Sequence, residues 1–313
     1  MSVFTKIKKG RIKKPLFLCM YAGPGVGKTD FGASFPKPLF FDFEESTHNI
    51  DVNRIDNITN FQEVMDALNE ILQEKTEHLE FKSMIFDTID ELERMMHQHI
   101  AEIAEKQSID SIGWQKGYDF AVNLWAKLIS LCRQIRDKHG IHFVFLAHAS
   151  FRSNKDIEKE ETYTRYSINL HKKAASFIFG QVEMVLFAKK EVKFKTDKDG
   201  NTYAKDSDKR TLCSTLSALY DAKNRIGLPP IMPMPVKNGY EVLWRAYEKA
   251  FNETSDDVYK ECVKLLDQVN DPEKKKQVSD YIDKNKKDLV IMRTSLNRIN
   301  EIIGEQNDKQ PAA

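Results

Sequence analysis

Four continuous apolar runs alternate with helical patterns in the first half of the chain. The apolar runs lie at 15–21, 38–44, 83–87 and 141–147. Between them, apolar positions recur at helical spacing at about 60–75, 91–107 and 117–138. Continuous apolar strands, rather than alternating ones, are typical of parallel strands that are buried on both faces. The alternation of strands and helices therefore predicts a mainly parallel sheet flanked by helices, the α/β class.

The pattern changes after residue 183. Strand-like runs at 184–194 and 202–203 flank Asp197-Lys-Asp-Gly-Asn201, which is a hairpin turn signal. A further strand is expected at about 211–223, so the sheet should continue with antiparallel strands.

From residue 240 onward the pattern is helical and rich in lysine. Near its end, apolar residues recur at alternating spacings of three and four, which forms a seam of Leu289, Met292, Leu296, Ile299 and Ile303. The seam is about two heptads long, too short to specify a coiled coil by itself. Either it packs within a small C-terminal helical bundle or it serves as a partner or self-association helix. The tail at 306–313 is expected to be disordered.

Composition narrows the class of protein. The length of 313 residues suits one large α/β domain with an appendage, or two domains. The formal net charge is +1, so no global positive field indicates nucleic acid, and a polyanion site must be a local patch. The four cysteines are scattered without metal-ligand spacing, which favours buried thiols in a reducing compartment. No apolar run is long enough to span a membrane and the start is too polar for a signal peptide, so a cytoplasmic protein is expected.

One short segment carries the strongest chemical signal. Residues 21–30 read Tyr-Ala-Gly-Pro-Gly-Val-Gly-Lys-Thr-Asp and lie between an apolar run and a short helix, the setting of a phosphate-binding loop (P-loop). Its glycines let the backbone bend around phosphate with the N–H groups pointing inward. The strict pattern has glycine where this chain has Ala22, a position that only requires a small residue. The predicted nucleotide-binding residues are Gly23, Pro24, Gly25, Val26, Gly27, Lys28, Thr29 and Asp30.

This motif implies ATP and Mg²⁺ as cofactors. Lys28 would reach the β- and γ-phosphates, and the Thr29 hydroxyl would hold Mg²⁺. Asp87 ends an apolar strand about 60 residues downstream, where an acid accepts the water ligands of Mg²⁺.

Two further polar residues follow predicted strands. Glu44 comes at the end of the strand after the P-loop helix, where a carboxylate can polarise an attacking water; the alternative is a solvated acidic loop. His148 follows Phe145-Leu-Ala147, where it can sense the γ-phosphate; the alternative is a capping or packing histidine.

The order of these motifs resembles the RecA-like recombinase and ATPase superfamily rather than the classical AAA+ group. Phe40-Phe-Asp-Phe-Glu44 is similar to the strand that delivers the catalytic glutamate in that superfamily, and Phe145-Leu-Ala-His148 to the strand ending in the γ-phosphate sensor. Lys223-Asn-Arg-Ile-Gly-Leu-Pro229 is similar to the stretch from which two cations reach across a subunit interface. Lys223 and Arg225, two apart on a strand, would point to the same side.

The resemblance implies a RecA-like P-loop NTPase core, with ATP held between subunits of a ring or filament. Lys223 and Arg225 would then stabilise transition-state charge at a neighbour's site. The expected organisation is a basic arm at 1–14, the core at 15–238, a helical extension at 239–305 and the tail. The basic residues of the arm are Lys6, Lys8, Lys9, Arg11, Lys13 and Lys14.

In RecA-like proteins the segment after the sensor strand is a mobile DNA-binding loop, which here corresponds to 150–173. Its aromatic and basic residues offer stacking and phosphate contacts to single-stranded DNA. They are Phe151, Arg152, Lys155, Tyr163, Arg165, Tyr166, Lys172 and Lys173. Glu158, Glu160 and Glu161 oppose this interpretation, and a solvated flexible loop is the alternative.

The compact form is most similar to phage-encoded RecA-like ATPases, some of which act in recombination or single-strand annealing. The expected function is therefore Mg²⁺-dependent ATP hydrolysis in phage recombination or annealing, with single-stranded DNA and a phage single-strand DNA-binding protein as partners. Two alternatives stay open: a nucleotide-switched interaction module and a helicase-like hexameric motor in phage replication or packaging.

Overall fold

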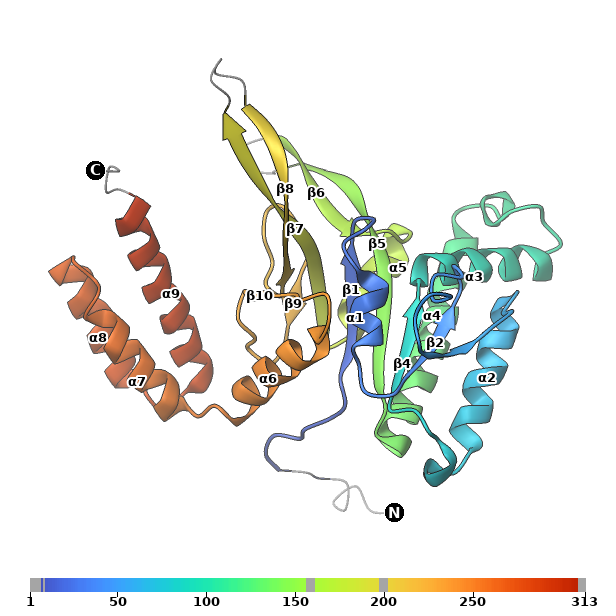
Figure 1. Ribbon diagram of the computed structural model, residues 1–313, viewed down its shortest axis with the longest axis horizontal. Coiled ribbons are helices and arrows are strands. Elements are labelled where there is room, and N and C mark those ends of the chain that lie inside the picture. Colours follow the sequence, from blue (N-terminus) through green and yellow to red (C-terminus); the bar gives the residue numbers. More distant parts are fainter. Residues whose placement is uncertain (1–6, 8, 156–160, 197–201, 309–313) are drawn as a thin grey trace. The chain divides into compact units, whose positions relative to one another are not determined.

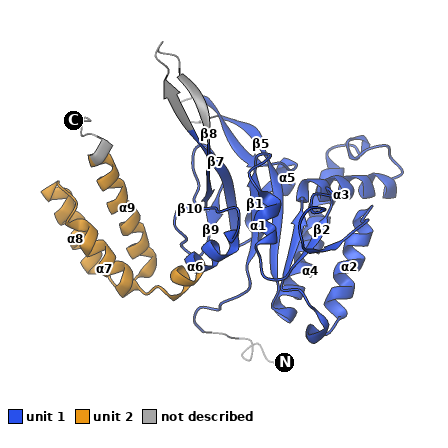
Figure 2. Ribbon diagram, in the orientation of Figure 1, with its two compact units in different colours: residues 1–246 blue, residues 247–313 orange. Residues whose placement is uncertain are grey.

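A mixed sheet with helices on both faces forms the larger part of the molecule (Figure 1). The structure, a computed structural model, describes residues 7, 9–155, 161–196 and 202–308. The chain divides into two compact units, 1–246 and 247–313 (Figure 2). Among the described residues, no helix combines the length and apolar character that crossing a membrane requires.

Five parallel strands form the centre of the sheet, and they follow the apolar runs of the sequence. In spatial order these strands are β7 (Met184–Thr196), β1 (Phe17–Ala22), β5 (His142–Lys155), β4 (Ser83–Asp87) and β2 (Pro38–Asp42). The short strand β3 (Asn53–Ile55), which the sequence pattern did not indicate, pairs in parallel with β2. β1, β2 and β4 are almost entirely buried, as continuous apolar strands between two helical layers should be.

Antiparallel strands extend this centre. The hairpin of β7 and β8 (Thr202–Cys213) confirms the expected extension, and β10 (Ile231–Pro233) pairs with β8 at the sheet edge. The continuous strand expected at 211–223 is wrong. Residues 211–213 are the end of β8, and Lys223 is the first residue of the short strand β9 (Lys223–Asn224). A loop joins the two strands.

The helices that cover the sheet are α1 (Lys28–Ala33), α2 (Phe61–Gln73), α3 (Ile89–Ile103), α4 (Lys116–His139) and α5 (Lys172–Gln181), and the described residues also form the short 3₁₀ turns η2 (Thr76–His78) and η3 (Ile109–Ser111). Helical periodicity predicted α2, α3 and α4, and α1 is the short helix expected after the P-loop. The sequence pattern did not indicate α5. The core that these helices close contains aromatic residues of all four of β1, β2, β4 and β5, together with Trp125 of α4; the strand residues are Phe17, Tyr21, Phe41, Phe86, Phe143 and Phe145. The α/β fold class expected from the sequence, a mainly parallel sheet with helices and an antiparallel extension, is confirmed.

The segment expected to be a loop at 150–173 is largely regular structure. β5 continues to Lys155, pairs antiparallel with β6 (Thr162–Ile168), and α5 begins at Lys172. The sequence pattern missed this hairpin because its strands alternate aromatic and polar residues instead of forming an apolar run. Glu158 and Glu160 lie outside the described residues.

The C-terminal part is a helical bundle with its own small core. α6 (Gly239–Asn252) begins in the first unit, where the Tyr240 N–H donates to Ser34 Oγ. The second unit contains α7 (Ser255–Leu266), α8 (Pro272–Asn285) and α9 (Leu289–Asp308). Met292 and Ile299 of the seam are fully buried in this unit, and the other seam residues pack against its core, as the bundle alternative predicted. α9 continues to Asp308, beyond the start of the expected tail, and residues 309–313 lie outside the described part.

All four cysteines are free thiols and buried, as their scattered spacing predicted. Burial raises the pKa of Cys19 and Cys132 well above the usual range, so neither thiol is a reactive thiolate near neutral pH. In the N-terminal arm, Lys14 forms an ion pair with Asp137 and Lys13 lies over the ring of Trp244. Lys6 and Lys8 of the arm lie outside the described residues.

Candidate nucleotide-binding site

The carboxyl ends of four parallel strands meet at one edge of the sheet. Ala22 of β1 is level with His148 of β5, and Asp42 of β2 is level with Asp87 of β4. Because the strands are parallel, the segments that leave them all emerge at this edge. The P-loop leaves β1 there, which brings the predicted residues of distant sequence segments together.

The P-loop has the backbone geometry that its glycines allow. Gly25 and Gly27 have φ values of 69° and 97°, in the left-handed region that favours glycine. Gly27 is the N-cap of α1, so Lys28 and Thr29 open the helix, and Asp30 lies in its first turn. This is the strand–loop–helix arrangement that the motif requires.

Thr29 and Asp87 lie in direct contact. The Thr29 hydroxyl donates to Asp87 Oδ2 at 2.8 Å, and the Ser46 hydroxyl donates to the same oxygen at 3.0 Å. Burial raises the pKa of Asp87, while the hydrogen bonds from Thr29 and Ser46 lower it, and the net shift is upward. A hydroxyl and a buried carboxylate at this spacing are the oxygen ligands that Mg²⁺ prefers, so the residues present fit the ion.

Asp42 holds the turn that follows β2. Its carboxylate accepts from the backbone N–H groups of Ser46 and Thr47, both at 2.9 Å, and from their hydroxyls. Burial raises the pKa of Asp42, but these hydrogen bonds lower it below its usual value. The turn fixes Ser46 against Asp87 and places the exposed Glu44 at the sheet edge.

Glu44, Asp90 and His148 form a polar cluster next to Asp87. Their ligand atoms all lie within 4.8 Å of one another. His148 Nδ1 lies 2.6 Å from Asp90 Oδ2 and 3.5 Å from Glu44 Oε1, while the Thr88 hydroxyl donates to Glu44 Oε1. The hydrogen bond to Asp90 raises the pKa of His148 above its ordinary value. Burial raises the pKa of Asp90, but its hydrogen bonds with His148 lower it below the usual range.

The sequence suggested that His148 ends its strand. This is wrong, because β5 continues to Lys155. The pairing of β5 with β1 nevertheless ends at His148, so the residue still lies at the carboxyl edge of the parallel sheet. A histidine there, held by an acid and facing Glu44, can respond to charge in the phosphate site.

Lys223 and Arg225 lie apart from this cluster, at the end of α5. The Lys223 ammonium donates to the Phe179 carbonyl, and Arg225 Nη2 donates to the Gly180 carbonyl at 2.9 Å. Burial, with a smaller effect of Arg225, lowers the pKa of Lys223 to about 8. Within one chain the two cations therefore bind neighbouring carbonyls at the end of α5. β9 ends at Asn224, so Arg225 lies outside the strand on which the expected alignment of the two side chains was based.

The hairpin of β5 and β6 distributes the predicted DNA-contact residues over both of its faces. Phe151 lies opposite Tyr166 with ring centroids 4.7 Å apart, while Arg152 lies opposite Arg165 on the other face. Phe151 is 68% exposed. Alternation along each strand puts Phe151 and Arg152 on opposite faces, while Lys155 lies on the face of Phe151 and Tyr163 on the face of Arg152.

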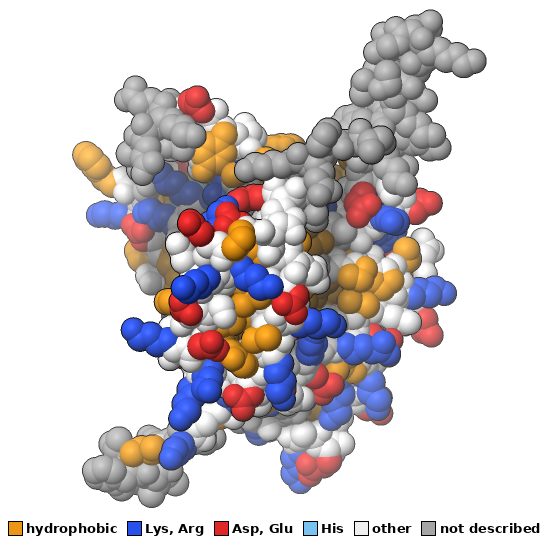
Figure 3. All heavy atoms as spheres, turned by 90° about the vertical axis from the view of Figure 1, so that its left-hand side faces the viewer, with side chains coloured by type: hydrophobic (Ala, Val, Ile, Leu, Met, Phe, Trp, Pro, Cys, Tyr) orange, Lys and Arg blue, Asp and Glu red, His pale blue; other side chains and the backbone are white. Residues whose placement is uncertain are grey.

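Several of the predicted cations are already bound within the protein. Arg152 Nη2 donates to the Leu170 carbonyl at 2.8 Å, and Arg165 forms an ion pair with Asp221 at 2.7 Å. Lys173 forms an ion pair with Asp119. On the face seen in Figure 3, basic and acidic side chains are interspersed, which agrees with the net charge of +1.

The residues that sequence reasoning missed are Ser46, Thr88, Asp90 and Arg210. Asp90 lies three residues after Asp87, a spacing that could have indicated it. Arg210 of β8 carries no local signal, but its guanidinium lies beside Gly27, where an added Cβ would be 2.2 Å from Nη1.

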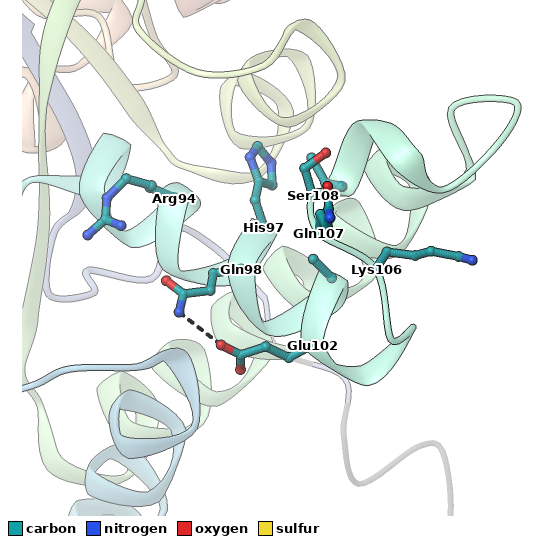
Figure 4. Close-up of a pocket in the computed structure, with 9 residues that line it drawn as sticks. Arg94, His97, Gln98, Glu102, Lys106, Gln107 and Ser108 are labelled. Atoms are coloured by element: carbon teal, nitrogen blue, oxygen red, sulfur yellow. Dashed lines mark hydrogen bonds between the residues drawn. The ribbon is translucent and has the colours of Figure 1, made fainter.

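A separate pocket lies at the C-terminal half of α3 (Figure 4). Its volume is about 440 Å³, and residues 94–109 supply its lining, which contains none of the predicted site residues. Gln98 Nε2 donates to Glu102 Oε1 at 2.8 Å across one turn of the helix. Lys, Arg and Glu side chains share this lining, so it has no single charge character.

The chain was compared with solved structures and with curated proteins. Two solved structures are similar to it: a KaiC-like protein from the hyperthermophilic archaeon Pyrococcus horikoshii OT3, and the RadB recombinase. The first has 10% identity and a TM-score of 0.37, and the similarity covers 72% of this chain and 88% of that one. The second has 11% identity and a TM-score of 0.39, covering 72% of this chain and 90% of that one. No curated protein matches the chain.

A family model described as an AAA domain matches residues 14–226, which is more than half of the chain and includes the P-loop, Asp87, His148 and the Lys223–Arg225 segment. With its P-loop and the acids that face it, this chain belongs to the AAA domain family.

Proposed function

We propose that the chain is a Mg²⁺-dependent protein that binds and hydrolyses ATP. The observation that carries the proposal is the convergence of Thr29, Asp87 and Glu44 at one sheet edge. Thr29 and Asp87 share a hydrogen bond of 2.8 Å, and Glu44 lies on the exposed side of the same cluster. A P-loop, a metal-positioning acid and a second carboxylate are the parts that phosphoryl transfer to water requires.

Each part has a definite role. The backbone N–H groups of Gly23–Thr29 and the Lys28 ammonium bind and orient the phosphates. The Thr29 hydroxyl and the Asp87 carboxylate would hold Mg²⁺, and the bound ion would supply positive charge that neutralises the phosphates. Glu44 accepts a hydrogen bond from the attacking water and polarises it, and His148 responds to the γ-phosphate through its contact with Glu44.

Phosphate release from MgATP by the full chain tests this function. The wild type should release phosphate, and Lys28→Ala should lose nucleotide binding. Glu44→Gln should retain ATP binding and lose hydrolysis by about 10²- to 10⁴-fold, the range for a general base. Glu45→Gln, a neighbouring exposed acid, is the matched control and should behave as the wild type. A wild type that binds no nucleotide would contradict the proposal.

We propose further that ATP lies between subunits of a ring or filament, where Lys223 and Arg225 complete a neighbour's site. Three features support this arrangement. Glu44 lies at the surface with its side chain 27% exposed, Arg225 is exposed, and both cations lie at the end of α5. An exposed catalytic carboxylate leaves one side of the phosphates open to solvent unless a neighbouring subunit covers it.

The cellular role that we propose is phage DNA recombination or single-strand annealing, with single-stranded DNA and a phage single-strand DNA-binding protein as partners. The exposed ring of Phe151 supports a DNA contact, because it is the outer member of an aromatic row that continues through Tyr166 and Phe187. An exposed aromatic ring backed by other rings is a stacking platform for bases.

Binding of a labelled oligothymidine at low salt tests the DNA contact. Phe151→Ala should weaken binding by about 1–3 kcal/mol, the cost of one lost base stack. Phe120→Ala is the matched control, because Phe120 is also exposed but lies on α4. Absence of wild-type binding and of DNA-stimulated hydrolysis would contradict the recombination role and favour the nucleotide-switched module. DNA-stimulated hydrolysis by a closed hexamer that unwinds duplexes would favour the motor.

A further inference from the structure

Arg210 of β8 reaches across β7 to the P-loop. Its Nη1 lies 3.8 Å from Asp30 Oδ2, and a Cβ built on Gly27 would be 2.2 Å from the same nitrogen. β8 is two strands away from β1 in the sheet, so only the length of an arginine side chain makes this approach possible. The guanidinium therefore touches the loop from the side opposite to β5.

The backbone around Arg210 is held in place on both sides. Arg210 is level with Lys190 of β7, and its carbonyl accepts from the Met234 N–H at 2.9 Å. The register of the hairpin shifts between Lys190 and Val192, directly next to this position. Such bulges change the direction of a side chain and recur beside active sites. The direction of Arg210 is thus built into the sheet.

The Arg210 guanidinium is largely buried although its contacts in the described structure do not satisfy all of its hydrogen-bond donors. Its side chain is 16% exposed, and Nη1 is fully buried without a hydrogen-bond partner among the described residues. Its acidic neighbour Asp30 is 44% exposed and 3.8 Å away, which makes the pair a weak one in solvent. A buried guanidinium with an unused donor is costly, and its planar fork matches phosphate oxygens.

We propose that Arg210 is a phosphate-binding residue, supplied by the same chain, that contacts the nucleoside di- or triphosphate held in the P-loop. This inference rests on the proposed nucleotide binding and adds a second cation to it. Lys28 approaches the phosphates from α1, and Arg210 approaches them from β8. Arg210 also offsets the charge of Asp30, a carboxylate in the first turn of α1 that would otherwise repel the phosphates.

Equilibrium binding of a fluorescent ADP derivative, N-methylanthraniloyl-ADP, with Mg²⁺ tests the proposal. Arg210→Ala in the full chain should raise the dissociation constant at least tenfold, and Arg210→Lys should have an intermediate effect because an ammonium lacks the fork. Lys209→Ala removes the neighbouring exposed lysine and should leave binding unchanged. Arg210→Gln, which keeps a polar side chain of similar size, replaces the alanine variant if thermal unfolding shows that the latter does not fold.

The two hypotheses fail in different ways. If Arg210→Ala and Arg210→Gln bind the probe within twofold of the wild type while Lys28→Ala does not bind it, nucleotide binding stands and the role of Arg210 is overturned. If the wild type does not bind the probe, the proposed function fails and the Arg210 proposal fails with it.

Asp30→Asn separates a direct phosphate contact from simple charge compensation. If Arg210 contacts phosphate, adding Asp30→Asn to Arg210→Ala should leave most of the binding defect in place. If the added substitution restores wild-type affinity, Arg210 acts only by neutralising Asp30, and the direct contact is overturned.

Discussion

Asp90 holds His148 by two hydrogen bonds, one from the backbone N–H at 2.9 Å and one from the ring Nδ1 at 2.6 Å. The two residues are 58 positions apart, in the first turn of α3 and at the carboxyl edge of the parallel pairing of β5. The same ring nitrogen lies 3.5 Å from Glu44. The carboxylate of Asp90 on α3 thus fixes the orientation of the His148 ring, which faces Glu44, the proposed general base.

Asp90→Asn should release His148 while leaving nucleotide binding intact. The pKa of His148 should fall toward its ordinary value, because the hydrogen bond to Asp90 is the main cause of its elevation. Hydrolysis should slow by about tenfold, which corresponds to roughly 1.4 kcal/mol, the order of one hydrogen bond. Histidine ring resonances followed by NMR against pH measure the first effect, and steady-state phosphate release measures the second. Glu91→Gln is the control, and an unchanged pKa of His148 would show that Asp90 does not control the ring.

Asp87→Asn should separate stability from metal binding. Asp87 is 1% exposed, and burial raises its pKa, so replacing the charge by an amide should leave the free energy of unfolding of the nucleotide-free protein unchanged or higher by up to about 1 kcal/mol. The amide oxygen can still accept from Thr29 and Ser46. The wild type should gain about 2.7 kcal/mol from MgADP at one hundred times its dissociation constant, and the variant should lose most of this gain. Thermal unfolding of both proteins with and without MgADP measures this stabilisation. Equal stabilisation of the wild type and the variant would contradict the role of Asp87.

Mixing two inactive variants should restore hydrolysis if the cations of one subunit serve another. The Arg225→Ala variant keeps an intact P-loop but lacks the Arg225 guanidinium. The Lys28→Ala variant keeps Arg225 but lacks a working P-loop. In an equal mixture, about a quarter of the interfaces combine an intact P-loop with an intact arginine, so about a quarter of the wild-type rate is expected. The rate of the mixture is compared with the sum of the separate rates. Equality of the two would mean that Arg225 acts only within its own chain, at the Gly180 carbonyl.

His142 should make the wild type lose stability in acid. It is 8% exposed, its Nδ1 accepts from the Leu16 N–H at 2.9 Å, and burial lowers its pKa from 6.5 to about 4. Between these pH values the unfolded chain binds a proton that the folded chain excludes, so the free energy of unfolding rises with pH in this window and is constant above it. The contribution lost from pH 7 to pH 4 is up to about 3 kcal/mol.

The variant His142→Asn isolates this effect, because an amide can accept from Leu16 and does not titrate. Urea unfolding of both proteins at pH 7, 5.5 and 4 should show that the advantage of the wild type shrinks as the pH falls. A difference in the free energy of unfolding that is constant with pH would contradict the buried, neutral histidine.

Local patterns were enough for the parts of the site that lie within one short segment. The P-loop was predictable because glycines, a lysine and a hydroxyl must follow one another in a fixed order to cradle phosphate. The strands that end at Asp42 and Asp87 were predictable because burial on both faces demands continuous apolar residues. Parallel alignment then placed Asp87 and His148 near the P-loop, since the carboxyl ends of such strands share one edge of the sheet.

The hairpin of β5 and β6 shows where pattern reasoning failed. Its aromatic and basic residues were interpreted as parts of a mobile DNA-binding loop. In a strand the same alternation sends Phe151 and Arg152 to opposite faces, and the Arg152 guanidinium donates to the Leu170 carbonyl beyond the end of β6.

The amino-acid sequence by itself therefore determined the phosphate-binding loop and the segments of the chain that form the central strands. Only the tertiary structure decided which side chains surround the loop. Asp90 binds His148 because α3 begins at the carboxyl edge of the parallel strands. Arg210 lies beside Gly27 because β8 is two strands from β1 in the sheet. Those contacts join residues far apart in the chain, and their formation depends on strand register and side-chain length rather than on any local motif.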